Sequence, residues 1–188
     1  LLYRELADYC EAKYSLLTQH TDPEKALPPL LVRQQKAVDL ITQCYQQMHM
    51  LSAQNNTDYK RMLRIFQEAL DLQEHISVSL HQPEEVQKLV ERSHAEEVIR
   101  WNAQTVAARL RVLADDILYH RLPTRFTMEK QIGALEKIAR QHPDNPVGQF
   151  CYWHFSRIAR VLRTQKPLYA RDLLADKQRR MPLLPALK

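Results

Sequence analysis

Hydrophobic residues recur at steps of three and four along most of the chain, the spacing that places side chains on one face of an α-helix. In the first segment, residues 1–20, this stripe consists of Leu2, Leu6, Tyr9 and Leu16, and Lys13 fills one of its positions. The same spacing predicts further helices over about residues 30–53, 58–80, 83–120, 127–141 and 147–165. Because short loops join antiparallel neighbours, we expect an all-α fold, an antiparallel up-and-down bundle of about six helices.

The most regular stripe lies in the second half of the longest predicted helix. It consists of Ile99, Ala103, Val106, Leu110, Leu113 and Ile117, in strict alternation of steps of four and three. The second helix has a stripe of Val38, Ile41, Tyr45 and Met48, and the third has one of Met62, Ile65, Ala69, Leu72 and Ile76. We expect these stripes to face the core of a single bundle domain over residues 1–166.

Prolines mark the predicted breaks, because proline lacks a backbone N–H and disfavours helical geometry in the residue before it. The pair Pro28-Pro29 is expected to keep the second helix from beginning before Leu30. Another proline-rich stretch, residues 142–148, precedes the last helix, and Thr127 is expected to cap the helix before it. The chain has only two glycines, which argues against a strand-rich fold with many tight turns.

The formal net charge is +5, and most of the excess lies at the C-terminal end. From Lys166 onward there are six Lys and Arg residues against two Asp, a net charge of +4. We predict residues 167–188 to be a basic, proline-containing juxtamembrane linker, since cations beside a membrane span are attracted to anionic lipid. The candidate membrane- or partner-facing residues are Arg157, Arg160 and Arg163 on the last helix, and Lys177, Arg179 and Arg180 in the tail. For the first three, the alternative is an ordinary solvated helix face.

Both ends of the chain read as those of a piece of a longer protein. It begins within a predicted helix, without an initiator methionine, and it ends in the apolar, proline-containing segment "MPLLPALK". No run of about 18 apolar residues is present, so we expect no membrane span within the sequence itself. The three cysteines are far apart and odd in number, which predicts reduced thiols of a cytosolic compartment.

The sequence predicts no catalytic, metal or cofactor site. Glu91 and His94 share one helical face, but dimetal sites in helical bundles need a second such pair. Cys151 and His154 have the spacing of metal ligands, but they lack the second pair that would close a tetrahedral zinc site. Neither glycine lies in a nucleophile elbow or a phosphate-binding loop. We therefore expect neither an enzyme nor a cofactor, and no nucleic-acid binding, because the basic residues gather at one end rather than over the body.

Three segments, taken in order, resemble one known family. "LLYRELADYCEAKYSLL" is a leucine-rich helix with a Leu-Ala-x-Tyr core, here Leu6 to Tyr9, followed by Lys13. "ALDLQEHISVSL" has an Asp-x-x-Glu, here Asp71 and Glu74, and "WNAQTVAARLRVLADDIL" is similar to a long central helix. Together they resemble the region after the first membrane bundle in the FUSC (fusaric acid resistance) superfamily, in its YccS/YhfK branch and closest to the YhfK type. The resemblance covers essentially the whole chain.

The resemblance implies a cytoplasmic helical domain between two membrane bundles of an efflux-type protein of the bacterial inner membrane. Relatives are linked with export of aromatic carboxylic acids, but the family offers no set of functional residues to carry over. The implied partners are the flanking transmembrane segments of the same protein and anionic lipid headgroups. The implied role is assembly, gating or partner contact, and it requires both termini to lie at one end of the bundle.

Two other hypotheses remain open at this point. A stand-alone ligand-binding or regulatory module would have a closed, aromatic pocket. Its lining would include Tyr45, Phe66, Trp101 and Trp153. An α-helical enzyme would need convergent titratable groups, which the sequence does not show. A homo-oligomer is expected of a transporter of this kind, and an exposed second stripe at Val98, Trp101 and Val112 would favour it.

Overall fold

The fold is known from a computed structural model that describes residues 1–18, 23–52, 57–78, 88–89 and 95–180. Its helices are α1 (Leu2–Thr18), α2 (Pro23–Ser52), α3 (Thr57–Ser77), α5 (Ala95–Leu118), α6 (Glu129–Gln141) and α7 (Pro146–Arg180). No strand occurs in these ranges, so the predicted all-α class is confirmed.

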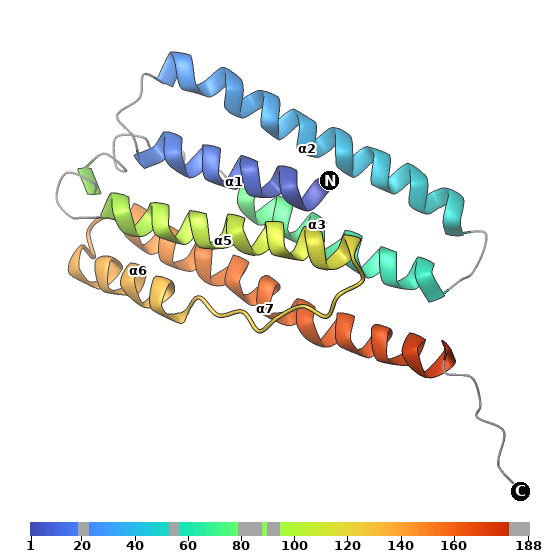
Figure 1. The fold of residues 1–188 in the computed structure, drawn as a ribbon. Coiled ribbons are helices and arrows are strands. Elements are labelled where there is room, and N and C mark those ends of the chain that lie inside the picture. The colour runs from blue at the N-terminus through green and yellow to red at the C-terminus, as the bar shows by residue number, and fades with distance from the viewer. Residues whose placement is uncertain (19–22, 53–56, 79–87, 90–94, 181–188) are drawn as a thin grey trace, which may run out of the picture.

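Successive helices run in alternating directions, as the up-and-down prediction requires (Figure 1). Helix α1 lies inside the bundle and packs most extensively against α5, and also against α2 and α3. Helix α7 packs against α3, α5 and α6 on the other side of the core. Helix α2 is outermost and, among the described helices, contacts only α1 and α3.

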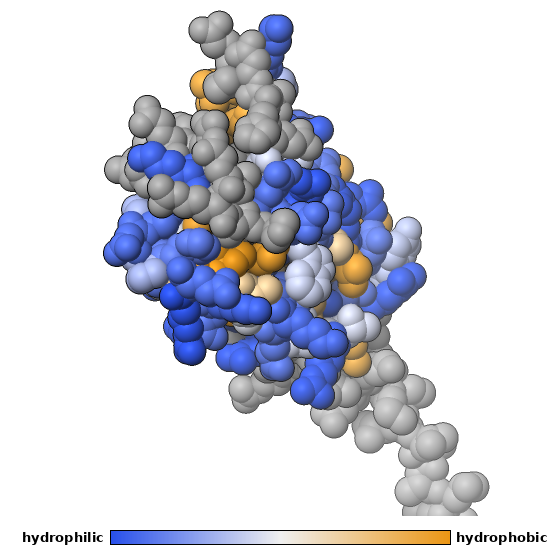
Figure 2. All heavy atoms as spheres, turned by 90° about the vertical axis from the view of Figure 1, so that its left-hand side faces the viewer, coloured by the Kyte–Doolittle hydropathy of each residue, from blue (hydrophilic) through white to orange (hydrophobic). Residues whose placement is uncertain are grey.

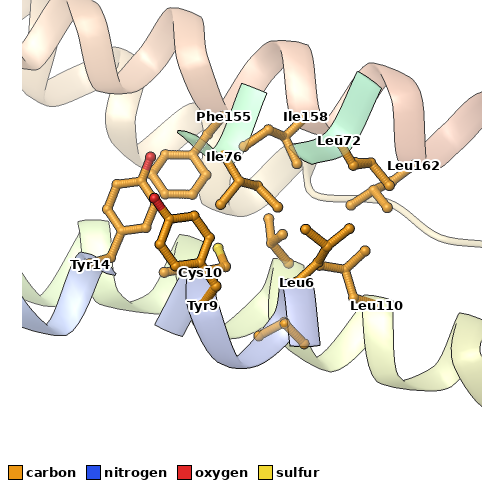
Figure 3. Close-up of a cluster of buried hydrophobic side chains, with 14 of the residues drawn as sticks. Leu6, Tyr9, Cys10, Tyr14, Leu72, Ile76, Leu110, Phe155, Ile158 and Leu162 are labelled. Atoms are coloured by element: carbon orange, nitrogen blue, oxygen red, sulfur yellow. The ribbon is translucent and has the colours of Figure 1, made fainter. Parts of the chain in front are cut away.

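The core is built from most of the stripe residues predicted on α1, α3 and α5, together with buried residues of α7. Met62, predicted to face the core from α3, is instead 42% exposed. Figure 3 shows its centre, where side chains of α1, α3 and α5 meet those of α7. The central residues are Leu6, Cys10, Tyr14, Leu72, Ile76, Leu110, Phe155, Ile158 and Leu162, all fully buried. The α5 stripe is buried from Ile99 to Leu113 and half-buried at Ile117, so the most regular pattern in the sequence is confirmed as a core face.

The prediction for α2 was wrong at its start and for part of its buried face. The helix begins at Pro23 and includes Pro28 and Pro29. Both prolines are exposed and lie in the second turn of the helix. Each removes one N–H donor from the helix, and the helix continues past both of them. Val38 and Tyr45, predicted to face the core, are exposed. The α2 residues that are buried are Ala37 and Met48.

Helix α7 is longer than predicted, because it continues beyond residue 165 to Arg180. The first part of the segment expected to be a linker, residues 167–180, is therefore helical, while residues 181–188 lie outside the described ranges. The cap predicted for α6 was wrong by one residue, because the N-cap is Met128, which makes no side-chain cap hydrogen bond. Thr127, the residue before it, accepts a long hydrogen bond from the Glu129 backbone N–H at 3.4 Å. Of the helix predicted over 83–120, the part from Ala95 onward is α5, and residues 83–87 and 90–94 are not described.

None of the helices in the described ranges is long and apolar enough to span a bilayer.

Candidate functional site

The arginine row predicted on the last helix is exposed to solvent on α7. Arg157, Arg160 and Arg163 all lie on the surface. The Arg157 guanidinium stacks over the exposed Trp153 ring, 4.6 Å from its centroid, a cation–π contact that orders both side chains. Lys177, Arg179 and Arg180 lie in the last turns of the same helix. The structure therefore places all six predicted cations on α7, and the side chains of the last three are outside what it describes.

A further group of cations lies at one end of the bundle, which we call the basic end. There α3 begins, α5 ends and α7 ends, on the same side of the molecule as Leu1 (Figure 1). Arg61 of α3 donates a hydrogen bond to His120 Nδ1 at 2.6 Å and so ties the start of α3 to the end of α5. The exposed cations of the basic end are Lys60 and Arg64 near the start of α3, and Arg121 just after the end of α5. Sequence reasoning missed this group, because its members are far apart in the chain and only the fold brings them together.

The two described acidic residues at the end of α5 are engaged or buried. Asp115 accepts a hydrogen bond from Arg4 of α1 at 2.6 Å. Asp116 is buried, and desolvation raises the pKa of its carboxyl group. Arg121 stacks on the Tyr119 ring, 4.8 Å from its centroid, and stays exposed. Among the side chains that the structure describes at this end, the solvent-facing charge is therefore mainly positive.

The opposite end of the bundle, where α1 ends and α5 and α7 begin, differs in character. Figure 2 shows this end face-on. Its visible surface is largely hydrophilic, with a small group of hydrophobic residues near the centre. The basic end also carries the start of α1 and the end of α7.

A groove of about 400 Å³ lies beside α1, between α2 and α5. Its lining residues are Asp8, Glu11, Ala12, Ser15, Arg33, Arg100, Ala103 and Gln104. On α5, Arg111 donates to Asp8 at 2.7 Å and to Glu11 at 2.6 Å, and these bonds raise the pKa of its guanidinium. Arg33 of α2 lies 3.6 Å from the same Asp8. The charges of the groove thus pair with one another and connect α1 to both neighbouring helices.

A buried polar cluster surrounds Lys13, the polar member of the α1 stripe. Its ammonium group donates to the Ile76 carbonyl at 2.5 Å and also to the Val78 carbonyl. These are carbonyls at the end of α3, so Lys13 caps that helix from a neighbouring one. Burial lowers the pKa of Lys13 to about 8 and raises that of the nearby thiols of Cys10 and Cys151 to about 12.

His154 of α7 completes this cluster as a packed, neutral ring. It stacks on Phe150 at a centroid distance of 5.3 Å and meets the rings of Tyr14 and Phe155. Burial lowers its pKa to about 3, with smaller contributions from Lys13 and His75. The ring packs as an aromatic core residue, and its neighbour Cys151 is a buried thiol. No three potential metal ligands come together anywhere in the described part of the chain, and Glu91 and His94 lie outside it.

One buried carboxyl group has no hydrogen-bond partner. Both carboxyl oxygens of Glu68 on α3 are buried and unpaired. Burial raises its pKa to about 7, and the neighbouring Asp71 adds to the shift. Arg64, one helical turn before Glu68 on α3, lowers this pKa and so offsets part of the shift.

The aromatic pocket expected for a stand-alone binding module is not formed. Tyr45, Trp101 and Trp153 lie on different helices, and each is at least 42% exposed. Phe66 is buried. Of the second stripe considered for oligomer contacts, Trp101 and Val112 are exposed, whereas Val98 is half-buried and packs against the core.

Comparison with known proteins gives one family. A family model described as FUSC-like, for the FUSC-like inner membrane protein yccS, matches residues 1–173 of the chain. The matched region runs from α1 well into α7, so it includes the whole bundle. No solved structure matches the chain.

Proposed function

The chain belongs to the FUSC-like family of inner membrane proteins, and from this membership we propose that it is the cytoplasmic helical domain of a multi-pass, efflux-type protein of the bacterial inner membrane. Its proposed role is assembly, gating or partner contact rather than chemistry. Within the family we propose the YhfK type, with export of compounds such as aromatic carboxylic acids as the task of the membrane parts.

The observation that carries this proposal is that the chain enters and leaves the bundle on the same side. Helix α1 begins and α7 ends on the same side of the molecule (Figure 1). A domain inserted between two membrane bundles must receive the chain from the membrane and return it there, so both connections must be on the membrane side. An even number of alternating helices meets this requirement, because it returns the chain to the side from which it started.

The charge of that same side supports the proposal. The exposed Lys60 lies near the start of α3 and the exposed Arg121 just after the end of α5, and the last turns of α7 contain three more cations. The cytoplasmic leaflet is anionic, and each Lys or Arg near its surface contributes about 1 kcal/mol of attraction. We therefore propose that the basic end faces lipid headgroups and that the predominantly hydrophilic opposite end points into the cytoplasm.

The charged groups elsewhere are suited to holding helices together. The acids and arginines of the groove bind one another across α1, α2 and α5, and Lys13 is engaged with two carbonyls of α3. These interactions make a rigid connection between the inner and outer helices. Such rigidity fits a domain that transmits or limits the movement of attached membrane segments.

A topology assay in intact cells tests the proposal. A reporter that is active only in the cytoplasm is fused after Lys188 in the full-length gene product, and its distribution between membrane and soluble fractions is followed. We expect an active reporter in the membrane fraction. An active reporter that is freely soluble, or a membrane-bound reporter that is inactive, would contradict the proposed location.

A further inference from the structure

Helix α2 has a second apolar face that the bundle leaves uncovered. On its inner side, Ala37 and Met48 are buried against α1 and α3. On its outer side, Leu31 is 52% exposed and Tyr45 is 62% exposed, with Val38 between them at 39%. We call Leu31, Val38 and Tyr45, with Gln35 and Thr42, the outer stripe. A helix that is apolar on two faces is typical of one that is buried on both sides in a larger assembly.

The spacing of the outer stripe matches that of helices that pair side by side. Leu31, Val38 and Tyr45 are each separated by one heptad, and Leu27 extends the row toward the start of the helix. A repeat of seven keeps one seam of a helix in contact with a partner helix over several turns. The stripe therefore fits another helix running along α2 better than it fits a small ligand or a loop.

The polar side chains of the stripe are already hydrogen-bonded within α2. The Thr42 hydroxyl donates to the Val38 carbonyl at 3.1 Å, and the Gln35 amide donates to Asp39 at 2.9 Å. A polar group that loses water without finding a partner costs about 1–3 kcal/mol. Because these two side chains have partners in their own helix, a second helix can cover them with little such loss.

The charge of this surface indicates what covers it. From Ala37 to Ser52, Asp39 is the single Asp, Glu, Lys or Arg. Nearer the helix start, Lys36 bonds to Glu5 of α1 at 2.5 Å, and Arg33 lies 3.6 Å from Glu5 and Asp8. Without free cations, the stripe has nothing to attract an anionic membrane or an acidic partner. Two copies of it, in contrast, meet without like-charge repulsion along the apolar row, and interface centres are depleted in charge in the same way.

We propose that two copies of the protein pair through the outer stripe of α2, with the two α2 helices parallel and in register, so that Leu31, Val38 and Tyr45 each meet their own counterparts. The parallel direction rests on the proposed function, because two copies anchored in one membrane must present their basic ends to the same side. The twofold axis then runs along the bundle, perpendicular to the membrane. This surface lies on α2, a different helix from the α5 stripe considered above.

Cross-linking of the chain in solution tests the pairing and its direction. In a Cys44→Ser background, Leu31→Cys is expected to form a disulfide-linked dimer under mild oxidation, and so is Tyr45→Cys. Gln47→Cys, which is also exposed on α2 but lies off the stripe, serves as the matched control and is expected to remain monomeric on the same gel. A mixed disulfide between the Leu31→Cys and Tyr45→Cys chains, without either self-linked product, would mean antiparallel helices and would overturn the proposal.

A charge placed in the stripe provides the second measurement. Val38→Glu puts two carboxylates opposite each other in the dimer, and we expect the dissociation constant from sedimentation equilibrium to rise about tenfold or more. Because Val38 is already partly exposed, the helical circular dichroism signal should be unchanged. A dimer unaffected by this substitution, or a wild-type chain that is monomeric at millimolar concentration, would overturn the proposal. Neither result alters the reporter assay, which reads membrane attachment alone, so failure of the dimer and failure of the proposed function are distinguishable.

Discussion

Lys13 shows how single residues stabilise the inner surfaces of this bundle. The sequence reveals that a lysine occupies a position of the apolar stripe on α1, but its partners are carbonyls at the end of α3. That pairing could not be predicted, because it depends on where α3 ends in space relative to α1. The same is true of Glu68, which lies at an ordinary position of an amphipathic helix and becomes unusual only through burial without a partner.

Replacing Lys13 tests its role as a cap for α3. Lys13→Met keeps the apolar stem but leaves the Ile76 and Val78 carbonyls without their donor. We expect a loss of about 2 kcal/mol in the free energy of unfolding, since each unsatisfied buried group costs about 1–3 kcal/mol and removal of the buried charge offsets part of it. Urea unfolding measures the loss, and Lys130→Met on the surface of α6 is the control, expected to stay within about 0.5 kcal/mol of wild type. An equally stable Lys13→Met would show that the cap is unimportant.

Glu68 should make stability depend on pH in a defined window. Its pKa of about 7 in the folded protein is above the ordinary value of 4.5, so the folded state holds the proton more tightly than the unfolded chain. The stability that protonated Glu68 contributes to the fold is fully present below about pH 4.5. It is lost as the pH rises through about 7. His154 has the opposite effect, because its lowered pKa makes stability rise with pH between about pH 3 and 6.5. A matched substitution is therefore needed to isolate the effect of Glu68.

Glu68→Gln is that substitution. It should stabilise the protein by about 1–2 kcal/mol at pH 8 and have little effect at pH 4.5. The value at pH 8 is smaller than the pKa shift of Glu68 alone would give, because water screens part of the charge. Glu74→Gln, at an exposed position of the same helix, should change stability little at either pH. Denaturant titrations at the two pH values provide the comparison, and an effect of Glu68→Gln that is equal at both would contradict the assignment.

Among the elements, α5 and α2 show what the hydrophobic pattern can and cannot predict. The α5 stripe was predicted correctly because this helix is apolar on one face and polar on the other, so the spacing has a single interpretation. The α2 pattern was misread because apolar residues surround the helix, and spacing alone does not say which of two faces meets the core. The exposed half of that pattern, Val38 and Tyr45, is the part that the proposed dimer covers.

The packing of α1 on α5 should depend on apolar contacts more than on ion pairs. Leu110→Ala removes a fully buried side chain from the α5 stripe and should lower the free energy of unfolding by about 2–5 kcal/mol. Its neighbour Arg111 bonds Asp8 and Glu11 at a partly exposed site, so Arg111→Gln should cost less than about 1 kcal/mol, and less still in high salt. Urea unfolding at low and high salt separates the two, and a larger loss for Arg111→Gln would reverse the account of this interface.

For the whole molecule, the main feature is that exposed cations from separate elements lie on the side where α1 begins and α7 ends. The net positive charge of the C-terminal segment was readable from the sequence, and it led to the prediction of a membrane-facing row on the last helix. The contributions of Lys60 and Arg121 were not readable, because the alternating helical topology brings the start of α3 and the end of α5 to the same side. The basic end is therefore a property of the fold as much as of the tail.

Binding to lipid vesicles should reflect this asymmetry. We expect the chain to bind vesicles rich in phosphatidylglycerol and to release them as salt increases, because the attraction is electrostatic. Lys60→Glu combined with Arg121→Glu should weaken binding about tenfold or more. The control reverses the same number of charges near the other end, with Lys137→Glu and Arg140→Glu on α6, and should change binding much less. Equal losses for the two double variants would show that total charge, rather than the basic end, governs binding.

The most direct measurement is the distance of each end of the domain from the bilayer in the full-length, membrane-embedded protein. In a Cys44→Ser background, a fluorophore is attached at Leu122→Cys, in the connection at the basic end, or at Gln141→Cys, at the end of α6 on the opposite side. Quenchers carried on lipid headgroups then report proximity to the membrane. The account predicts strong quenching at position 122 and little at position 141. Stronger quenching at position 141, or none at either position, would contradict the claim that the basic end of this bundle faces the membrane.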